Sequence, residues 1–212
     1  MANFDEYYAA TQDAEPHQNV VMFLRKGKKP GIAVDLGCGA GRDTVLLLKN
    51  GWTVIAYDIN NNADYILPKL TPEERNRFTF VQSRHQDAEI PKCDLVVANN
   101  SMHYLKREEF KAIIDKIYDS LNTNGEFIAE FLGSKDDWAK NNPNDAYYSL
   151  RELRELMGNK FEFEAFREHE FDKPTLDGQP KHWQTISVMT RAKNKNLINS
   201  NIIHKKEDDV ER

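Results

Sequence analysis

Short apolar runs alternate with amphipathic segments over the first two thirds of the chain. The apolar runs predict five strands, over residues 32–36, 53–58, 78–82, 94–98 and 126–132. The segments between them predict helices over about 42–50 and 63–70, a short helix after a capping box at Thr71, and a long helix over 110–121. In the long helix, apolar residues recur at spacings of three and four, which places them on one face of the helix that can be buried. This alternation predicts an α/β fold.

The pattern changes after residue 132. Ser149, followed three positions later by Glu152, predicts the start of another helix. Two longer segments, about 161–171 and 182–191, predict strands, and the turn-rich segment 173–180 between them predicts a hairpin connection. We therefore expect an α/β repeat that ends in a hairpin.

Three segments differ in composition. Residues 1–30 are polar with a few apolar positions, and they predict an N-terminal helical cap segment. Residues 31–192 carry the α/β pattern and are expected to form one domain. Residues 193–212 are rich in Asn and charged side chains and lack periodicity, which predicts a disordered tail.

The overall composition limits the classes of partner and the cellular location that we expect. A formal net charge of −5 and a pI near 5.7 argue against a large nucleic-acid footprint, which needs clustered Lys and Arg. The N-terminus is acidic where a signal peptide is basic, and no run of about eighteen apolar residues could span a membrane, so we expect a cytoplasmic protein. Cys38 and Cys93 are too few for a disulfide framework and lack metal-ligand spacing, so we expect buried thiols.

The most informative motif is a glycine loop that follows the predicted strand 32–36. It contains Gly37, Gly39 and Gly41, and a helical pattern starts at Arg42. Glycines at a strand-to-helix turn let the backbone bend tightly and let a ligand approach, and the helix start presents free N–H groups. Arg42 stands where the dinucleotide fingerprint G-x-G-x-x-G has its last glycine, and no lysine followed by Ser or Thr closes the loop as in a P-loop. The motif therefore predicts a nucleotide-type cofactor that is not a triphosphate.

An acidic residue, Asp58, ends the next predicted strand, 53–58. It lies about twenty residues past the glycines, a position from which a carboxylate can accept hydrogen bonds from both ribose hydroxyls. Asp58 is therefore the predicted ribose ligand.

Four segments resemble, in chain order, successive motifs of class I S-adenosylmethionine-dependent methyltransferases: Val34-Asp35-Leu36-Gly37-Cys38-Gly39-Ala40-Gly41, Ala56-Tyr57-Asp58, Gln86-Asp87-Ala88 and Asp94-Leu95-Val96-Val97-Ala98-Asn99. The resemblance covers most of residues 31–191. It implies a Rossmann-like fold with a central, mainly parallel seven-stranded sheet, an antiparallel last strand and helices on both faces. It also implies S-adenosylmethionine as the cofactor and methyl transfer as the activity.

The resemblance further implies which residues line the donor site. The first two loop glycines would flank the methionine moiety, Asp58 would hold the ribose, and Asp87 would accept from the adenine amino group. Asn99 and its neighbours would line the methyl-donor side. Solvated turn acids are the alternative for Asp35 and Asp87. The full predicted set is Asp35, Gly37, Cys38, Gly39, Asp58, Ile59, Gln86, Asp87, Ala88 and Asn99.

The acceptor side holds a candidate base. The donor's sulfonium is already a strong electrophile, so a base is needed only if the acceptor carries a proton. His103 follows the predicted strand 94–98, and we predict it as the catalytic residue. A loop histidine that packs against the next helix is the alternative. Tyr7, Tyr8 and Trp138 could form an aromatic lid, and simple surface packing of an N-terminal helix explains them slightly better.

The turn after strand 94–98 informs the choice of acceptor. It reads Asn99-Asn100-Ser101-Met102, whereas amino-group methylases carry an Asn/Asp-Pro-Pro-Tyr motif there, and it is similar to the turn of many small-molecule methyltransferases. We therefore predict a small-molecule acceptor, with no nucleic-acid or membrane partner and no metal. The alternatives are a catalytically silent S-adenosylmethionine-binding protein of the same fold and a nicotinamide-dependent oxidoreductase, against which Arg42 argues. The acceptor and the oligomeric state stay open.

Overall fold

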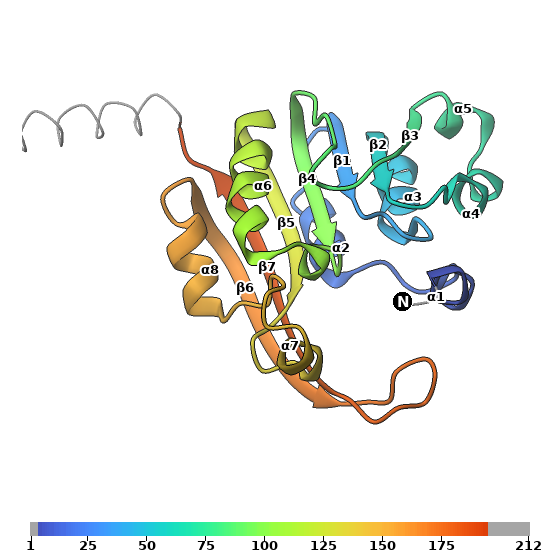
Figure 1. Cartoon of the computed structure of the whole chain (residues 1–212). Coiled ribbons are helices and arrows are strands. Elements are labelled where there is room, and N and C mark those ends of the chain that lie inside the picture. Colours follow the sequence, from blue (N-terminus) through green and yellow to red (C-terminus); the bar gives the residue numbers. More distant parts are fainter. Residues whose placement is uncertain (1–3, 195–212) are drawn as a thin grey trace, which may run out of the picture.

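A single seven-stranded sheet organises the protein, and the computed structural model describes residues 4–194 (Figure 1). The strand order is β3-β2-β1-β4-β5-β7-β6. Strands β1 to β5 pair in parallel, and β7 runs antiparallel to both β5 and β6. This confirms the expected mainly parallel sheet with an antiparallel last strand. The strands are β1 Ile32–Leu36, β2 Thr53–Asp58, β3 Phe78–Gln82, β4 Cys93–Asn99, β5 Leu121–Leu132, β6 Phe161–Asp172 and β7 His182–Ala192.

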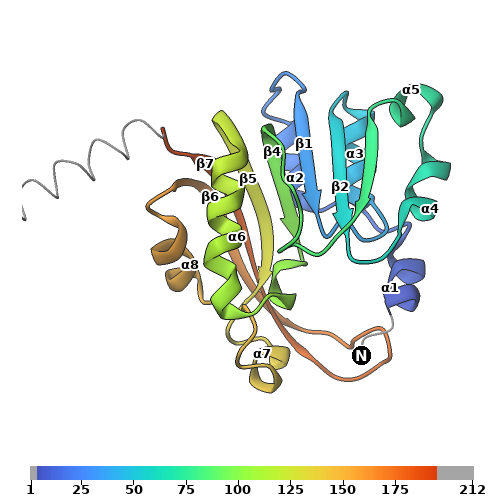
Figure 2. The same ribbon diagram turned by 45° about the horizontal axis from the view of Figure 1, so that its top comes forward.

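Helices cover both faces of the sheet (Figures 1 and 2). Neighbouring residues of a central strand point to opposite faces, so Val34 and Ala33 enter different cores. Val34 packs in the core that includes α6 (Arg107–Ser120) and α8 (Leu150–Met157). Ala33 packs in the core that includes α2 (Gln18–Leu24) and α3 (Arg42–Lys49). Burial on both faces explains why the central strands read as continuous apolar runs.

The segment between β2 and β3 differs from the single helix that we expected over 63–70. It forms α4 (Ala63–Ile66) followed by a 3₁₀ turn, Leu67–Lys69. Pro68 lies in that turn, and because proline has no N–H it cannot continue the α-helical ladder. The next helix, α5 (Pro72–Arg75), begins with the expected capping box at Thr71.

Three other features depart from the sequence expectations. The N-terminal segment holds two helices, α1 (Phe4–Thr11) and α2, and Figures 1 and 2 show α1 at the edge of the sheet where the parallel strands end. Strand β5 begins at Leu121, five residues before the predicted start. Helix α7 (Asp137–Asn141) was not predicted.

Residues 195–212, which make up most of the segment expected to be a disordered tail, lie outside the described residues. Within residues 4–194, none of the helices has the length and apolar character needed to cross a membrane. Cys38 and Cys93 are both buried thiols, as expected.

Helix α6 is expected to be a principal source of stability. Ile117 is fully buried against the sheet, so Ile117→Ala should lower the free energy of unfolding by about 2–5 kcal/mol through lost packing and the cavity left behind. Urea denaturation followed by circular dichroism measures this. Lys111→Ala, in the same helix but with a side chain 70% exposed, should change the free energy of unfolding by less than about 0.5 kcal/mol. Equal losses in the two variants would contradict the assignment.

Candidate active site

The glycine loop after β1 folds onto the end of β2. The amides of Gly37 and Cys38 both donate to the carbonyl of Tyr57, at 2.8 and 3.0 Å. The amide of Gly39 donates to the carboxylate of Asp58 at 2.8 Å. The loop and the predicted ribose ligand are therefore brought into direct contact.

Two glycines of the loop serve different purposes. Both have positive φ, +74° at Gly37 and +55° at Gly39, where other residues are strained. A Cβ on Gly37 would lie 2.3 Å from the Cβ of Ser101, so Gly37 allows the loop after β4 to pack closely. A Cβ on Gly39 would meet nothing nearer than the Tyr8 ring at 3.8 Å. A Cβ would therefore have room at Gly39, and the Tyr8 ring of α1 packs against this side of the loop.

The Asp58 carboxylate is buried and receives three hydrogen bonds. Besides the Gly39 amide, the amide of Asn60 donates to it at 3.2 Å and the Tyr8 hydroxyl donates at 3.0 Å. Burial raises the pKa of Tyr8 to about 12, so its hydroxyl stays protonated at neutral pH and remains a donor.

Asp35 and Asn99 face the protein interior. Asp35 is buried rather than solvated, accepts from the Thr44 hydroxyl at 2.6 Å, and has its pKa raised to about 7 by burial and by the nearby charge of Asp43. The Asn99 amide nitrogen donates to Asp43 at 2.8 Å and to Asn19 at 3.1 Å, and its oxygen accepts from Asn19 at 2.7 Å. Both side chains therefore hold α2 and α3 against the ends of β1 and β4.

Asp43 is also the anchor for the start of α2. His17 donates to it from its backbone amide at 2.8 Å, and the His17 Nδ1 lies 2.7 Å from its other oxygen. Hydrogen bonds from His17 and Asn99, together with the charge of His17, offset the effect of burial and lower the pKa of Asp43. The sequence analysis missed this network, because nothing in the spacing of His17 and Asp43 links them.

The other predicted donor-site residues lie on the loops after β2 and β3. The two loops are joined: the Ser83 amide donates to the Asp58 carbonyl at 2.8 Å, and the Gln82 side chain donates to the Ile59 carbonyl at 2.9 Å. The side chain of Ile59 is 52% exposed. Beyond it, Gln86 is half-buried, Asp87 exposed and Ala88 buried, in a turn whose amides at 87 and 88 donate to the Arg84 carbonyl.

His103 is buried within an aromatic cluster, not exposed on a loop. Its ring centroid lies 4.1 Å from that of Tyr104, 5.9 Å from Tyr147 and 6.1 Å from Trp138, and neither ring nitrogen has a hydrogen-bond partner. Burial, and then the positive charge of Lys181, lowers the pKa of His103 to about 3. The imidazole is therefore neutral at physiological pH.

A buried ion pair borders this cluster. The Lys181 ammonium donates to both oxygens of Asp136, at 2.6 and 2.7 Å, and lies 3.3 Å from the ring centroid of Trp183 and 4.3 Å from that of Trp138. Asp136 also caps α7 by accepting from the Trp138 amide at 3.0 Å. Sequence analysis missed both residues, since a lysine beside a turn is normally exposed.

Unpartnered buried polar atoms gather at this end of the sheet. Of the six described residues with such an atom, four lie on the loops after β2, β3 and β4, namely Asn62, His85, Asn100 and His103, whereas Glu126 and Arg191 lie on β5 and β7. Such atoms cost free energy unless a ligand or water satisfies them. They therefore make the carboxyl edge of the sheet a candidate ligand site.

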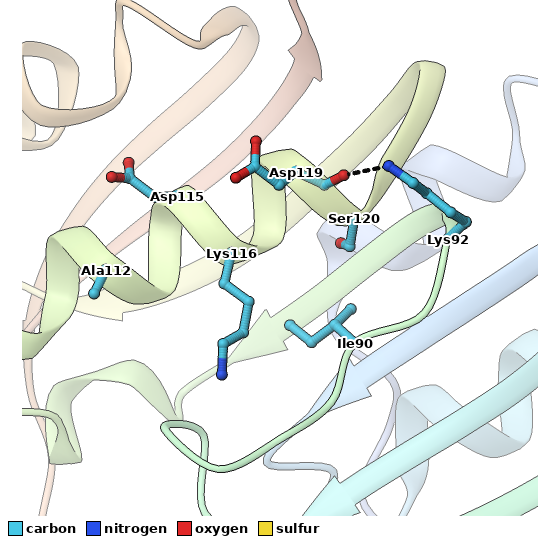
Figure 3. A pocket seen from close by; sticks show the side chains of 7 residues that line it. All are labelled: Ile90, Lys92, Ala112, Asp115, Lys116, Asp119 and Ser120. Carbon is cyan, nitrogen blue, oxygen red and sulfur yellow. Dashed lines mark hydrogen bonds between the residues drawn. The ribbon is translucent and has the colours of Figure 1, made fainter.

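Two surface hollows lie elsewhere. One is lined by α6 and the loop before β4, where Lys92 donates to the Asp119 carbonyl at 2.6 Å (Figure 3). The other lies along α8, from Leu150 to Glu155. Neither contains a residue predicted for donor or acceptor.

His103 should make stability depend on pH. An unfolded histidine has a pKa of 6.5, so between pH 6.5 and 3 the unfolded chain binds a proton that folded His103 does not, and stability falls as pH falls. Between pH 7 and 5 this costs roughly 2 kcal/mol of unfolding free energy. The parent protein should lose that much more than His103→Phe in urea denaturation at the two pH values. Identical losses would show that His103 is not held neutral.

Comparison with known proteins finds methyltransferases. A family model described as "Methyltransferase domain" matches residues 34–127. The chain is 23% identical over 192 residues to the probable S-adenosyl-L-methionine-dependent methyltransferase TehB of Haemophilus influenzae, covering 89% of this chain and 67% of that protein. It is 31% identical over 85 residues to the magnesium-protoporphyrin O-methyltransferase of Rhodobacter capsulatus, covering 40% of this chain and 38% of that enzyme.

Solved structures agree in fold. The TehB structure from Haemophilus influenzae superposes with a TM-score of 0.70 at 23% identity, covering 90% of this chain and 67% of that one. The Burkholderia thailandensis 1,6-didemethyltoxoflavin-N1-methyltransferase superposes with a TM-score of 0.64 at 16% identity, covering 91% and 86%. The family-model match and both relatives are methyltransferases and the solved structures share the fold, so the comparisons support a class I S-adenosylmethionine-dependent methyltransferase with S-adenosylmethionine as its cofactor.

Proposed function

We propose that the protein transfers a methyl group from S-adenosylmethionine to a small-molecule acceptor at the carboxyl edge of its sheet. The observation that carries the proposal is the contact between the glycine loop and Asp58, because it joins the two features that a nucleoside donor needs. The proposal is further supported by the unpartnered polar atoms on the neighbouring loops.

Different residues of the chain would bind different parts of the donor. Asp58 would accept from the ribose hydroxyls, and the loop at Gly37 to Gly39 would lie along the methionine moiety. The exposed side chain of Ile59 offers an apolar surface to the adenine, and Asp87 would accept from the adenine amino group. Each of these positions lies at the carboxyl end of β1, β2 or β3 or on the loop that follows it.

Four other predicted residues would act less directly. The side chains of Asp35 and Asn99 already form hydrogen bonds with other residues of the protein. We therefore propose that these side chains position α2 and α3 and do not bind the donor directly. Cys38 and Ala88 are buried and would shape the site through their backbone. Burial raises the pKa of the Cys38 thiol, which keeps it protonated and unreactive.

His103 is the proposed acceptor-side residue. Bound S-adenosylmethionine supplies a methyl group on an electrophilic sulfonium, and His103 would contact the acceptor through a ring nitrogen that lacks a partner in the protein. Because its pKa is about 3, the neutral imidazole is a weak base. His103 therefore suits an acceptor whose attacking atom is already nucleophilic and does not need to be deprotonated first.

A small-molecule acceptor is supported by two observations. The Burkholderia thailandensis structure that shares the fold contains 1,6-didemethyltoxoflavin together with S-adenosylhomocysteine. The net charge of −5 also disfavours a polyanionic acceptor.

A second candidate is a protein that binds the donor but does not transfer its methyl group. The enclosure of His103, which is only 4% exposed, favours it. An acceptor panel assayed for release of S-adenosylhomocysteine distinguishes the two. Turnover above background with any acceptor removes the silent alternative.

Donor binding is the first test. Isothermal titration calorimetry with S-adenosylmethionine and S-adenosylhomocysteine should give saturable binding to the parent protein. An absence of heat for both ligands at millimolar concentration would remove the proposal.

Asp58→Ala should weaken donor binding by about thirty- to nearly a thousandfold. The loss of charge-assisted hydrogen bonds to the ribose is worth roughly 2–4 kcal/mol, which corresponds to that range of dissociation constants. His103→Ala is the matched control, since it should reduce turnover and leave donor affinity nearly unchanged. Thermal unfolding confirms that both variants fold. Parent-like affinity in folded Asp58→Ala would mean that the donor binds elsewhere.

A further inference from the structure

Tyr8 occupies the centre of the proposed donor site. It is the one buried residue of α1, at 3% exposure, and its hydroxyl donates to Asp58 at 3.0 Å. The Asn60 side chain donates to the same hydroxyl at 3.1 Å. The Tyr8 ring lies 3.8 and 3.9 Å from where a Cβ of Gly39 would project.

These contacts use the groups that a nucleoside would need. A phenol hydroxyl and a ribose hydroxyl both donate an O–H to a carboxylate, so either can fill the same place on Asp58. One Asp58 oxygen already accepts from Tyr8 and from the Asn60 amide, and the other accepts from Gly39. A ribose that binds through two hydroxyls must compete for the lone pairs that Tyr8 uses.

Helix α1 also contacts the rest of the protein through aromatic rings and through a backbone carbonyl just past its end. Phe4 meets Tyr104 edge-on at 5.7 Å, Tyr8 meets Tyr65 at 6.2 Å, and Lys69 donates to the Gln12 carbonyl just beyond the helix. Figures 1 and 2 show α1 beside the carboxyl ends of the strands, outside the two helical layers. An element with so little buried surface can move at small cost.

We propose that Tyr8 closes the donor site in the ligand-free protein by placing its hydroxyl where a ribose hydroxyl binds, so that the donor displaces α1 as it enters. The inference rests on the proposed donor site. The protein then binds its donor only from the fraction of molecules in which Tyr8 has left Asp58, and the apparent affinity is reduced by that fraction.

Removal of one oxygen atom tests this. Tyr8→Phe keeps the ring but loses the hydrogen bond to Asp58, so S-adenosylhomocysteine should bind about three- to thirtyfold more tightly than to the parent in calorimetry. Tyr7→Phe removes the same atom from the neighbouring residue, which is 40% exposed, and should bind like the parent. Unchanged or weaker binding by Tyr8→Phe overturns the inference, since Tyr8 would then contribute to the bound state.

Hydrogen exchange of the unmodified protein gives an independent measure. Saturation with S-adenosylhomocysteine should speed amide exchange in residues 4–11, because α1 leaves its place. Slower exchange there would mean that α1 closes over the ligand, and would overturn the inference while leaving the donor site intact. If the parent protein fails to bind S-adenosylhomocysteine at all, the proposed function fails and this inference falls with it.

Discussion

Burial of β1 and β4 on both faces is the constraint from which the rest of the structure follows. A strand whose alternate residues all enter a core cannot lie at an edge, so β1 and β4 must be central and helices must cover both sides. Parallel neighbours joined through those helices all end at the same edge of the sheet. The loops that carry Gly39, Asp58 and His103 are therefore brought together by packing, before any ligand is present.

The hydrogen bond from Gly39 to Asp58 holds two of these converging segments in one fixed arrangement. It links residues nineteen positions apart and fixes the glycine loop relative to the end of β2. Gly37 supports the arrangement from the other side, since only a residue without a side chain fits against Ser101. Ser101 in turn donates to the Leu36 carbonyl at 2.7 Å, which ties the loop after β4 to β1.

The sequence predicted what depends on local pattern. The predicted bounds of β1, β2 and β3 agree with the structure, and so do the capping boxes at Thr71 and Ser149. Both kinds of prediction depend only on residues that are close together in the sequence. Local pattern also predicted that the glycine loop and Asp58 belong together. It could not predict α7, which is only five residues long and depends on the Asp136 cap.

Contacts between residues far apart in the sequence could not be predicted. The pairing of Lys181 with Asp136 spans 45 residues, and that of Tyr8 with Asp58 spans 50. The aromatic pattern of α1 favours surface packing slightly over a lid, because the pattern does not show which polar group a tyrosine will meet. The burial of His103 could not be predicted either, since two of the rings that enclose it, Trp138 and Tyr147, lie 35 and 44 positions further along the chain.

The ion pair beside His103 is better explained by electrostatics than by stability. A buried ion pair often contributes little to stability, because desolvation of both charges offsets their attraction. Here Asp136 neutralises the ammonium, yet Lys181 still opposes protonation of His103. An imidazolium at the proposed acceptor side would repel a sulfonium donor, whereas a neutral imidazole does not. The pair thus keeps His103 neutral without adding an unpaired positive charge, which favours binding of a cationic methyl donor at the proposed site.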